Sequence, residues 1–245
     1  MITAKHHWLA DALIYRYLIG LCRKRFHSVK VKGLDHLDLL DPMTPVIAIA
    51  NHTNWWDGFM AYFLSKKMKD HQIHLMMEHK QMQHYSIFRH IGAFSVELDS
   101  KIKSAKSLHY AVRVLQKPSS LMWIFPQGSM VSPHAPLKFK PGLDFLIKKT
   151  PQVQLMTIAF RYEFLREDRP QALVLIDQPQ LITPSSTASP EDQLHQCCEK
   201  LFQDLKAHTL DDYQSLLAPQ LSINKKWEKF LFTIRGESSI FKQNN

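Results

Sequence analysis

Glycine is scarce in this sequence, with 7 residues in 245. None of them forms the GxGxxG or GxxxxGK pattern that cradles nucleotide phosphates. Cysteine is scarcer still. Cys22, Cys197 and Cys198 are odd in number and two are adjacent, so they predict neither a disulfide framework nor a CxxC metal site. The pattern is typical of a reducing compartment, and we expect a cytoplasmic protein.

Long apolar runs are also absent. A membrane-spanning helix needs about 20 predominantly apolar residues, and no stretch meets that standard. Residues 1–26 predict an amphipathic helix instead, closed by Arg23-Lys24-Arg25, and no secretory signal is indicated. This helix either lies in a membrane interface or packs on the domain as an ordinary surface helix. The first alternative predicts a peripheral protein on the inner face of the membrane.

Acidic residues are outnumbered, with Lys+Arg 31 against Asp+Glu 22 and a net charge of +9. This excess predicts an anionic partner: a phospholipid surface, the phosphates of a coenzyme, an acidic carrier protein or nucleic acid. The basic residues are dispersed and no DNA or RNA motif is present, so we expect no nucleic-acid partner.

Fourteen histidines raise the question of a metal. They show neither HExxH nor accompanying cysteines, so no metal site is predicted.

Apolar segments typical of strands alternate with helical patterns along most of the chain, which predicts an α/β fold. We expect a single domain with a mixed, largely crossover-connected sheet that is flanked by helices, plus the N-terminal amphipathic helix. We expect the catalytic domain over 27–210 and a C-terminal extension over 211–245. Strands are predicted at His27–Lys32, Val46–Ala50, His74–Glu78, Phe94–Leu98, Leu121–Phe125, Val153–Phe160 and Ala172–Ile176. Helices are predicted at Asp57–Lys69, Met82–His90, Ser104–Gln116, Leu143–Lys149 and from Pro190 onward, with a loop over Pro179–Pro190.

The strand Val46–Ala50 runs directly into Asn51-His52-Thr53-Asn54-Trp55-Trp56-Asp57. A neutral imidazole can accept a proton from a hydroxyl near pH 7, and a carboxylate on its other nitrogen would fix the tautomer. Ligands of open α/β sheets collect at the carboxyl ends of such strands. His52 and Asp57 are therefore a candidate catalytic pair, although for such a pair taken alone the commoner explanation is structural: a strand-end histidine that caps the next helix, with Asp57 in its first turn.

A second apolar strand ends in Phe125-Pro126-Gln127-Gly128-Ser129, and Phe139-Lys140-Pro141-Gly142 follows. NHTNWWD, FPQGS and FKPG, in this order and spacing, resemble the glycerolipid acyltransferase family, the lysophospholipid acyltransferases related to 1-acyl-glycerol-3-phosphate acyltransferase. The resemblance covers about Val29 to Phe160. It implies an enzyme in which His52 is the general base and Asp57 orients it.

The resemblance also implies the substrates. The acceptor hydroxyl attacks an acyl thioester, either acyl-CoA or acyl-carrier-protein, and no metal or redox cofactor is required. Oxyanion donors are expected in the backbone around Gly128, where a side chain is absent. Tryptophans in the first motif wall a lipid channel or pack in the core. The candidate substrate-binding residues are Asn54, Trp55, Trp56, Gln127, Gly128, Ser129, Lys138, Lys140 and Gly142.

The sequence departs from the family pattern at two arginines. The usual FPEGTR reads FPQGSM here, with Gln127 for Glu and Met130 for Arg. An upstream strand that usually ends in Asp-Arg ends in Asp99-Ser100. A thioether cannot replace a guanidinium that binds phosphate. We therefore hypothesise that the acceptor is not lysophosphatidic acid and carries a neutral head group such as a sugar, although nearby lysines leave a phosphate open.

Two other functions stay open on the sequence alone. The first is a non-catalytic lipid or acyl-carrier binding protein that kept the fold and lost the chemistry, which Gln127 and Met130 favour and the intact pair His52 and Asp57 disfavours. The second is nucleic-acid binding, which only the net charge suggests.

Overall fold

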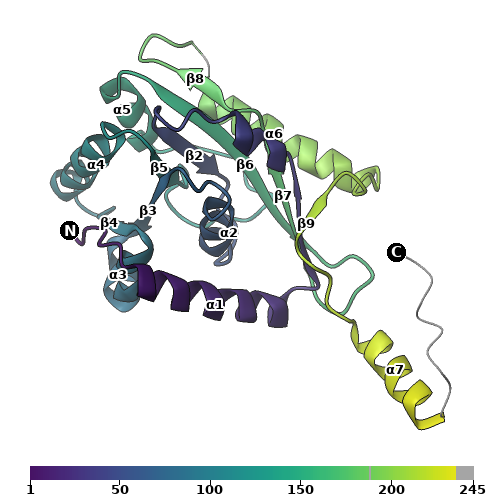
Figure 1. Ribbon diagram of the computed structural model, residues 1–245. Coiled ribbons are helices and arrows are strands. Elements are labelled where there is room, and N and C mark those ends of the chain that lie inside the picture. Colours follow the sequence, from purple (N-terminus) through teal and green to yellow (C-terminus); the bar gives the residue numbers. More distant parts are fainter. Residues whose placement is uncertain (188, 236–245) are drawn as a thin grey trace.

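The computed structural model describes residues 1–187 and 189–235 (Figure 1). This part of the chain contains a nine-stranded sheet in the order β4-β3-β5-β2-β6-β7-β1-β9, with β8 paired to β6. The strands are β1 (Ser28–Lys32), β2 (Val46–Ala50), β3 (Gln72–Glu78), β4 (Ala93–Val96), β5 (Ser120–Ile124), β6 (Val153–Glu163), β7 (Gln171–Ile176), β8 (Gln180–Ile182) and β9 (Gln214–Leu217). The predicted α/β class with one mixed sheet is confirmed.

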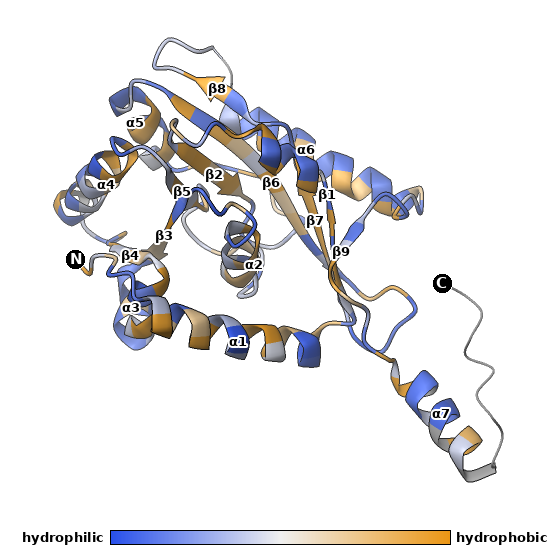
Figure 2. Ribbon diagram, in the orientation of Figure 1, coloured by the Kyte–Doolittle hydropathy of each residue, from blue (hydrophilic) through white to orange (hydrophobic). Residues whose placement is uncertain are grey.

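Helices flank the sheet on both faces (Figure 1). They are α1 (Trp8–Arg25), α2 (Asp57–Ser65), α3 (His79–His84), α4 (Lys101–Leu115), α5 (Gly142–Lys149), α6 (Pro190–Lys206) and α7 (Ile223–Arg235), with 3₁₀ segments η1 (Leu34–Leu39) and η2 (Ser86–Ile91). On one face of the sheet, α1 and α2 pack against the strands and form one hydrophobic layer. On the opposite face, α4, α5 and α6 pack against the strands and form the second layer. Figure 2 shows the apolar strands enclosed between the helices.

Strand direction places the carboxyl ends of five strands, β2 to β6, at the same edge of the sheet. β2 is parallel to β5 and β6, and β3 is parallel to β4 and β5. All five residues of β2 are buried, as expected for a strand covered on both faces. Since the crevice at such carboxyl ends is where open α/β sheets bind ligands, the loops after β2, β3 and β5 are the first place to look for a site.

The first helix uses two of its faces. Ile14, Leu18 and Cys22 are spaced four apart and buried against the domain. Leu13 and Tyr17 lie on another side and are 62% and 69% exposed. The apolar residues of α1 thus do not form the single broad face that the sequence suggested. One row packs on the domain and a second row is left exposed.

The elements predicted from the sequence differ from the structure in three places, two of which are short strands. Residues Pro179–Pro190 were expected as a loop, but Gln180–Ile182 forms β8 against β6. The helix expected over Met82–His90 is in fact α3 followed by η2, with Tyr85 in neither. β9, from the expected C-terminal extension, pairs with β1 in the main sheet.

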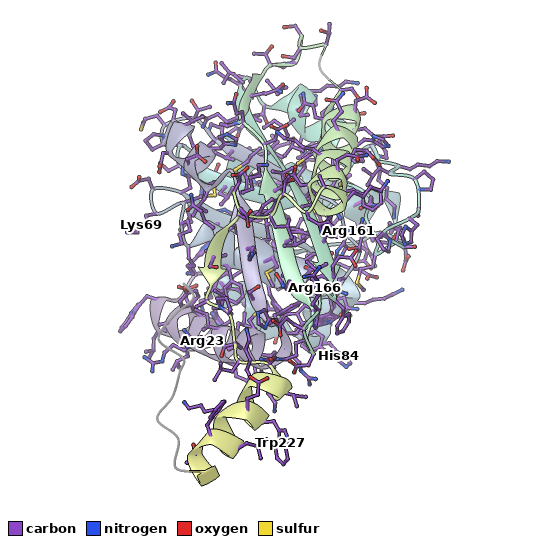
Figure 3. All side chains as sticks on the ribbon, turned by 90° about the vertical axis from the view of Figure 1, so that its right-hand side faces the viewer. Arg23, Lys69, His84, Arg161, Arg166 and Trp227 are labelled. Atoms are coloured by element: carbon purple, nitrogen blue, oxygen red, sulfur yellow. The ribbon has the colours of Figure 1, made fainter. Side chains whose placement is uncertain are left out.

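The last described helix, α7, extends away from the rest of the fold (Figure 1). Trp227 projects from it in Figure 3 and is 61% exposed. No helix within the described ranges is both long and apolar enough for a membrane crossing.

Candidate active site

The candidate pair lies in the loop that joins β2 to α2. Asn51 directly follows β2, and its side chain both donates to the carbonyl of Phe160 at 2.9 Å and accepts from the Phe160 amide at 2.7 Å. These two bonds fasten the loop to β6. Asp57 begins α2, where a carboxylate is favoured by the amides of the first helical turn. Strand and helix therefore hold the two ends of the pair rigidly.

His52 and Asp57 meet directly. The distance between His52 Nδ1 and Asp57 Oδ2 is 2.9 Å. A carboxylate can only accept, so the proton of this bond belongs to Nδ1 and Nε2 is left with a lone pair. The side chain of His52 is 22% exposed, whereas that of Asp57 is fully buried. The arrangement is that of a general base with a carboxylate that orients it.

Asp57 is buried with four donors around it. Besides His52, the amides of Thr53 and Asn54 donate to Oδ2 at 2.7 and 2.8 Å. The hydroxyl of Tyr162 donates to Oδ1 at 2.7 Å. Burying a carboxylate is costly unless hydrogen bonds compensate it, and these donors supply that compensation. The carboxylate is consequently held in one orientation.

Tyr162 was not among the residues predicted from the sequence. It lies near the end of β6, 105 positions from Asp57, and is partly buried. Burial and the neighbouring charge of Asp57 raise the pKa of the Tyr162 hydroxyl well above its usual value, so it stays a proton donor to Asp57. No short-range pattern could have identified it, because the contact depends on how β6 pairs with β2.

The FPQG turn after β5 supports the histidine. The ring of Phe125 stacks on the imidazole of His52, with centroids 4.4 Å apart. Oε1 of Gln127 accepts from the His52 amide at 2.7 Å, and Gln127 is only 5% exposed. Gln127 was predicted to bind substrate. The structure instead places it under the His52 main chain, outside the lining of the adjacent cavity.

Gly128 adopts a left-handed conformation with φ of +72°. Its amide donates to the carbonyl of Phe125 at 2.9 Å, so that N–H is already engaged in the turn. The Lys140 side chain fills the space beside it: a Cβ at Gly128 would lie 2.6 Å from Lys140 Cδ. The Lys140 amide also donates to the Pro126 carbonyl at 2.8 Å. The two later motifs are thereby joined next to His52.

A cavity of about 770 Å³ lies beside His52 and reaches both packing layers of the sheet. Leu75, Met77 and Phe88 line it on the layer of α2, and Met76 and Leu146 line it on the layer of α5. Its polar or charged lining side chains are His52, Glu78, Gln81, Ser104, Ser129 and Lys140. A mostly apolar cavity with a few polar groups is typical of a site for a small organic ligand, and its size is within the usual range.

The predicted site residues separate into two sets. Those that line the cavity are His52, Trp55, Gly128, Ser129, Lys140 and Gly142. Asp57 and Gln127 hold His52 from behind, and the Asn54 side chain accepts from the Trp56 amide at 3.2 Å. Trp56 packs edge-on against Phe26 with ring centroids 4.9 Å apart. Lys138 is exposed and does not belong to the lining.

Comparison with protein families gives a match over the region that carries the candidate site. A protein-family model described as Acyltransferase matches residues 28–161, more than half of the chain. The matched span contains His52, Asp57, the Gly128 turn and Lys140, and it ends one residue before Tyr162. No curated protein matches the chain.

Proposed function

The chain belongs to the acyltransferase family and is an acyl-transferring enzyme, and from this premise we propose that it moves a fatty acyl group from an acyl thioester to a hydroxyl of a lipid acceptor. The observation that carries the proposal is an imidazole held by a buried carboxylate on the wall of a large apolar cavity. We expect the reaction to serve phospholipid biosynthesis or another branch of lipid metabolism.

The proposed chemistry needs one base and two substrates. His52 Nε2 takes the proton of the acceptor hydroxyl while the oxygen attacks the thioester carbonyl, and Asp57 stabilises the imidazolium that forms. The tetrahedral oxyanion then collapses, the C–S bond breaks and the imidazolium returns the proton to the thiolate. Either acyl-CoA or acyl-carrier-protein supplies the thioester, and the reaction requires no metal or redox cofactor. The acyl chain would occupy the apolar lining that includes Met76, Leu108 and Leu146.

The charges of the cavity lining support a particular kind of acceptor head group. Met130 lines it and is 52% exposed where the family has an arginine, and the carboxylate of Glu78 lines it too. A carboxylate would repel a phosphate and can accept from hydroxyls. Among the described residues that line the cavity, Lys140 is the lysine or arginine. We therefore propose an acceptor with a neutral, hydroxyl-bearing head group in preference to lysophosphatidic acid.

Restoring the arginine should change acceptor preference. In Met130→Arg, we expect kcat/KM for lysophosphatidic acid to rise about tenfold, since a charge-assisted hydrogen bond is worth about 1.5–3 kcal/mol. Palmitoyl-CoA would serve as donor, with lysophosphatidic acid and a glycosylated monoacyl lipid as competing acceptors. Met43→Arg is the matched control, because Met43 is 68% exposed and lies outside the cavity lining. A wild-type preference for lysophosphatidic acid would refute the proposed acceptor class.

The exposed row of α1 supports a membrane partner. Leu9, Leu13 and Tyr17 are spaced four apart on one side of the helix, and Trp8 beside them is 80% exposed. The basic triplet lies in the last turn of the same helix. Apolar side chains flanked by basic ones bind interfaces of anionic lipid. We propose that α1 packs on the domain with one face and rests on the inner face of a membrane with the other.

Removing part of this row should weaken lipid binding. The double variant Trp8→Ser with Leu13→Ser should partition into anionic vesicles at least about tenfold less, since burying each side chain contributes about 1.5–3 kcal/mol. Sedimentation with phosphatidylglycerol–phosphatidylcholine vesicles measures this. Leu39→Ser, which changes a 59% exposed leucine on η1, should bind like the wild type. Equal partitioning of all three proteins would remove α1 from the membrane role.

A further inference from the structure

Tyr162 connects three parts of the fold at the catalytic pair. It lies on β6, its hydroxyl donates to Asp57 on α2, and its ring packs against Phe26 at the end of α1, with centroids 5.7 Å apart. It also lies just beyond the span that the family model matches. Neither the motifs nor the family match assigns it a role.

The two oxygens of Asp57 have different partners. Oδ2 accepts from His52 and from the amides of Thr53 and Asn54. For Oδ1, the bond found within residues 1–187 and 189–235 comes from Tyr162. Rotation about the Cβ–Cγ bond moves both oxygens, so the donors on Oδ2 and the Tyr162 hydroxyl on Oδ1 together hold the plane of the carboxylate. The Tyr162 bond therefore contributes the restraint on the Oδ1 side to how Asp57 faces the imidazole.

We propose that Tyr162 is a positioning residue for the reaction: its hydroxyl fixes the plane of Asp57 and withdraws part of the negative charge that His52 faces. The catalytic part of this proposal rests on the proposed function. A hydrogen bond to a carboxylate reduces the charge available to the imidazolium on its other side. With Tyr162 in place, the carboxylate that orients His52 through Nδ1 is itself held from its other oxygen.

Few other ionisable groups face this network. Cys22, on α1, lies near enough to influence Tyr162 electrostatically, and burial raises the pKa of its thiol to about 12, so it stays neutral. Lys140 and Glu78 line the same cavity as His52 and add one positive and one negative charge on that side. In the described part of the chain, the donors to Asp57 are His52, the amides of Thr53 and Asn54, and Tyr162, so the effect of Tyr162 should be separable from that of these other charged groups.

The test measures the His52 titration in the full chain and needs no substrate. Histidine labelled with ¹⁵N gives the imidazole titration by NMR, and His52→Gln identifies the His52 signals. In Tyr162→Phe the pKa of His52 should rise by about half a pH unit, because the carboxylate keeps more of its charge. The control is Tyr62→Phe, which removes another buried tyrosine hydroxyl from an aspartate: Tyr62 Oη donates to Asp11 at 2.7 Å, away from the cavity. It should leave the His52 titration unchanged.

A second variant keeps the test decisive if Tyr162→Phe does not fold. Difluorotyrosine at position 162 keeps the ring and the hydroxyl but makes the O–H a stronger donor, so the pKa of His52 should fall. An unchanged His52 titration in the variants that fold would overturn the proposal. The titration needs no substrate, so its result does not depend on whether the protein transfers acyl groups. Failure of the Tyr162 proposal can therefore be told apart from failure of the proposed function.

Kinetics supply the complementary readout. With palmitoyl-CoA and whichever of lysophosphatidic acid and the glycosylated monoacyl lipid the wild type acylates faster, Tyr162→Phe should lower kcat about tenfold and change KM by less than about twofold, because an orienting residue acts on the chemical step. The acid limb of the pH profile should move upward together with the pKa of His52. A rise in KM at unchanged kcat would assign Tyr162 to substrate binding and overturn the positioning role.

Discussion

Replacing His52 with alanine should lower acyl transfer by about a thousandfold or more while the protein stays folded. General-base catalysis contributes about 10²–10⁴-fold, and the Asp57 carboxylate would lose the imidazole that it orients. The side chain of His52 is on the cavity wall and not in the core, so its removal should cost little stability. Palmitoyl-CoA thioester cleavage measured against a panel of lipid acceptors gives the rate.

The matched control is His195→Ala, which removes an exposed imidazole from α6 and should retain wild-type turnover. Circular dichroism and vesicle binding of His52→Ala should equal those of the wild type. Substantial turnover in His52→Ala would assign the base role elsewhere. A wild-type protein that binds palmitoyl-CoA but acylates nothing in the panel would instead support the alternative of a non-catalytic lipid or acyl-carrier binding protein.

Gly92→Ala should produce the largest loss of stability, about 3 kcal/mol or more. Gly92 has φ of +98°, where a side chain is strained, and a Cβ there would lie 2.2 Å from the carbonyl oxygen of Ile73. That oxygen belongs to the backbone of β3, so the clash can be relieved only by moving strands. The Gly92 carbonyl also accepts from the Leu75 amide at 3.0 Å. Urea unfolding followed by circular dichroism measures the change.

Gly20→Ala provides the comparison for this prediction. Gly20 lies within α1, and a Cβ there would meet nothing within 4 Å. Alanine is preferred over glycine inside a helix by about 1 kcal/mol, so this variant should be more stable than the wild type. If Gly92→Ala unfolds at the same urea concentration as the wild type, the strand contact between Gly92 and Ile73 is less restrictive than the geometry indicates.

Local patterns sufficed for much of the architecture. The apolar runs at β2 and β5 predicted buried strands, and the alternation of strands with helices predicted the α/β class. The three motifs predicted the acyltransferase family, which the match over residues 28–161 confirms. The prediction failed for β8, a strand of three residues in a segment rich in Pro, Ser and Thr. Its pairing with β6 exists only through tertiary contact, which no local pattern encodes.

The candidate site divides in the same way. His52 and Asp57 are five residues apart, so their contact could be anticipated from one loop. The bonds from Gln127 to the His52 amide and from Tyr162 to Asp57 span 75 and 105 positions. They depend on the order of β5, β2 and β6 in the sheet, which the sequence does not state. The roles of His52 and Asp57 in catalysis stay predictions until the variants are measured.

Phe26 follows the last residue of α1, and its ring packs against both Trp56 and Tyr162. The helix that we propose to rest on lipid is therefore also joined by packing to the residues behind the candidate pair. A shortened form that starts after Phe26 would lose this packing against Trp56 and against the tyrosine beside Asp57. The first helix should therefore be retained for crystallisation or for attaching the enzyme to another membrane anchor. Aggregation through its exposed apolar side chains can be reduced with detergent or by mutation of those surface residues.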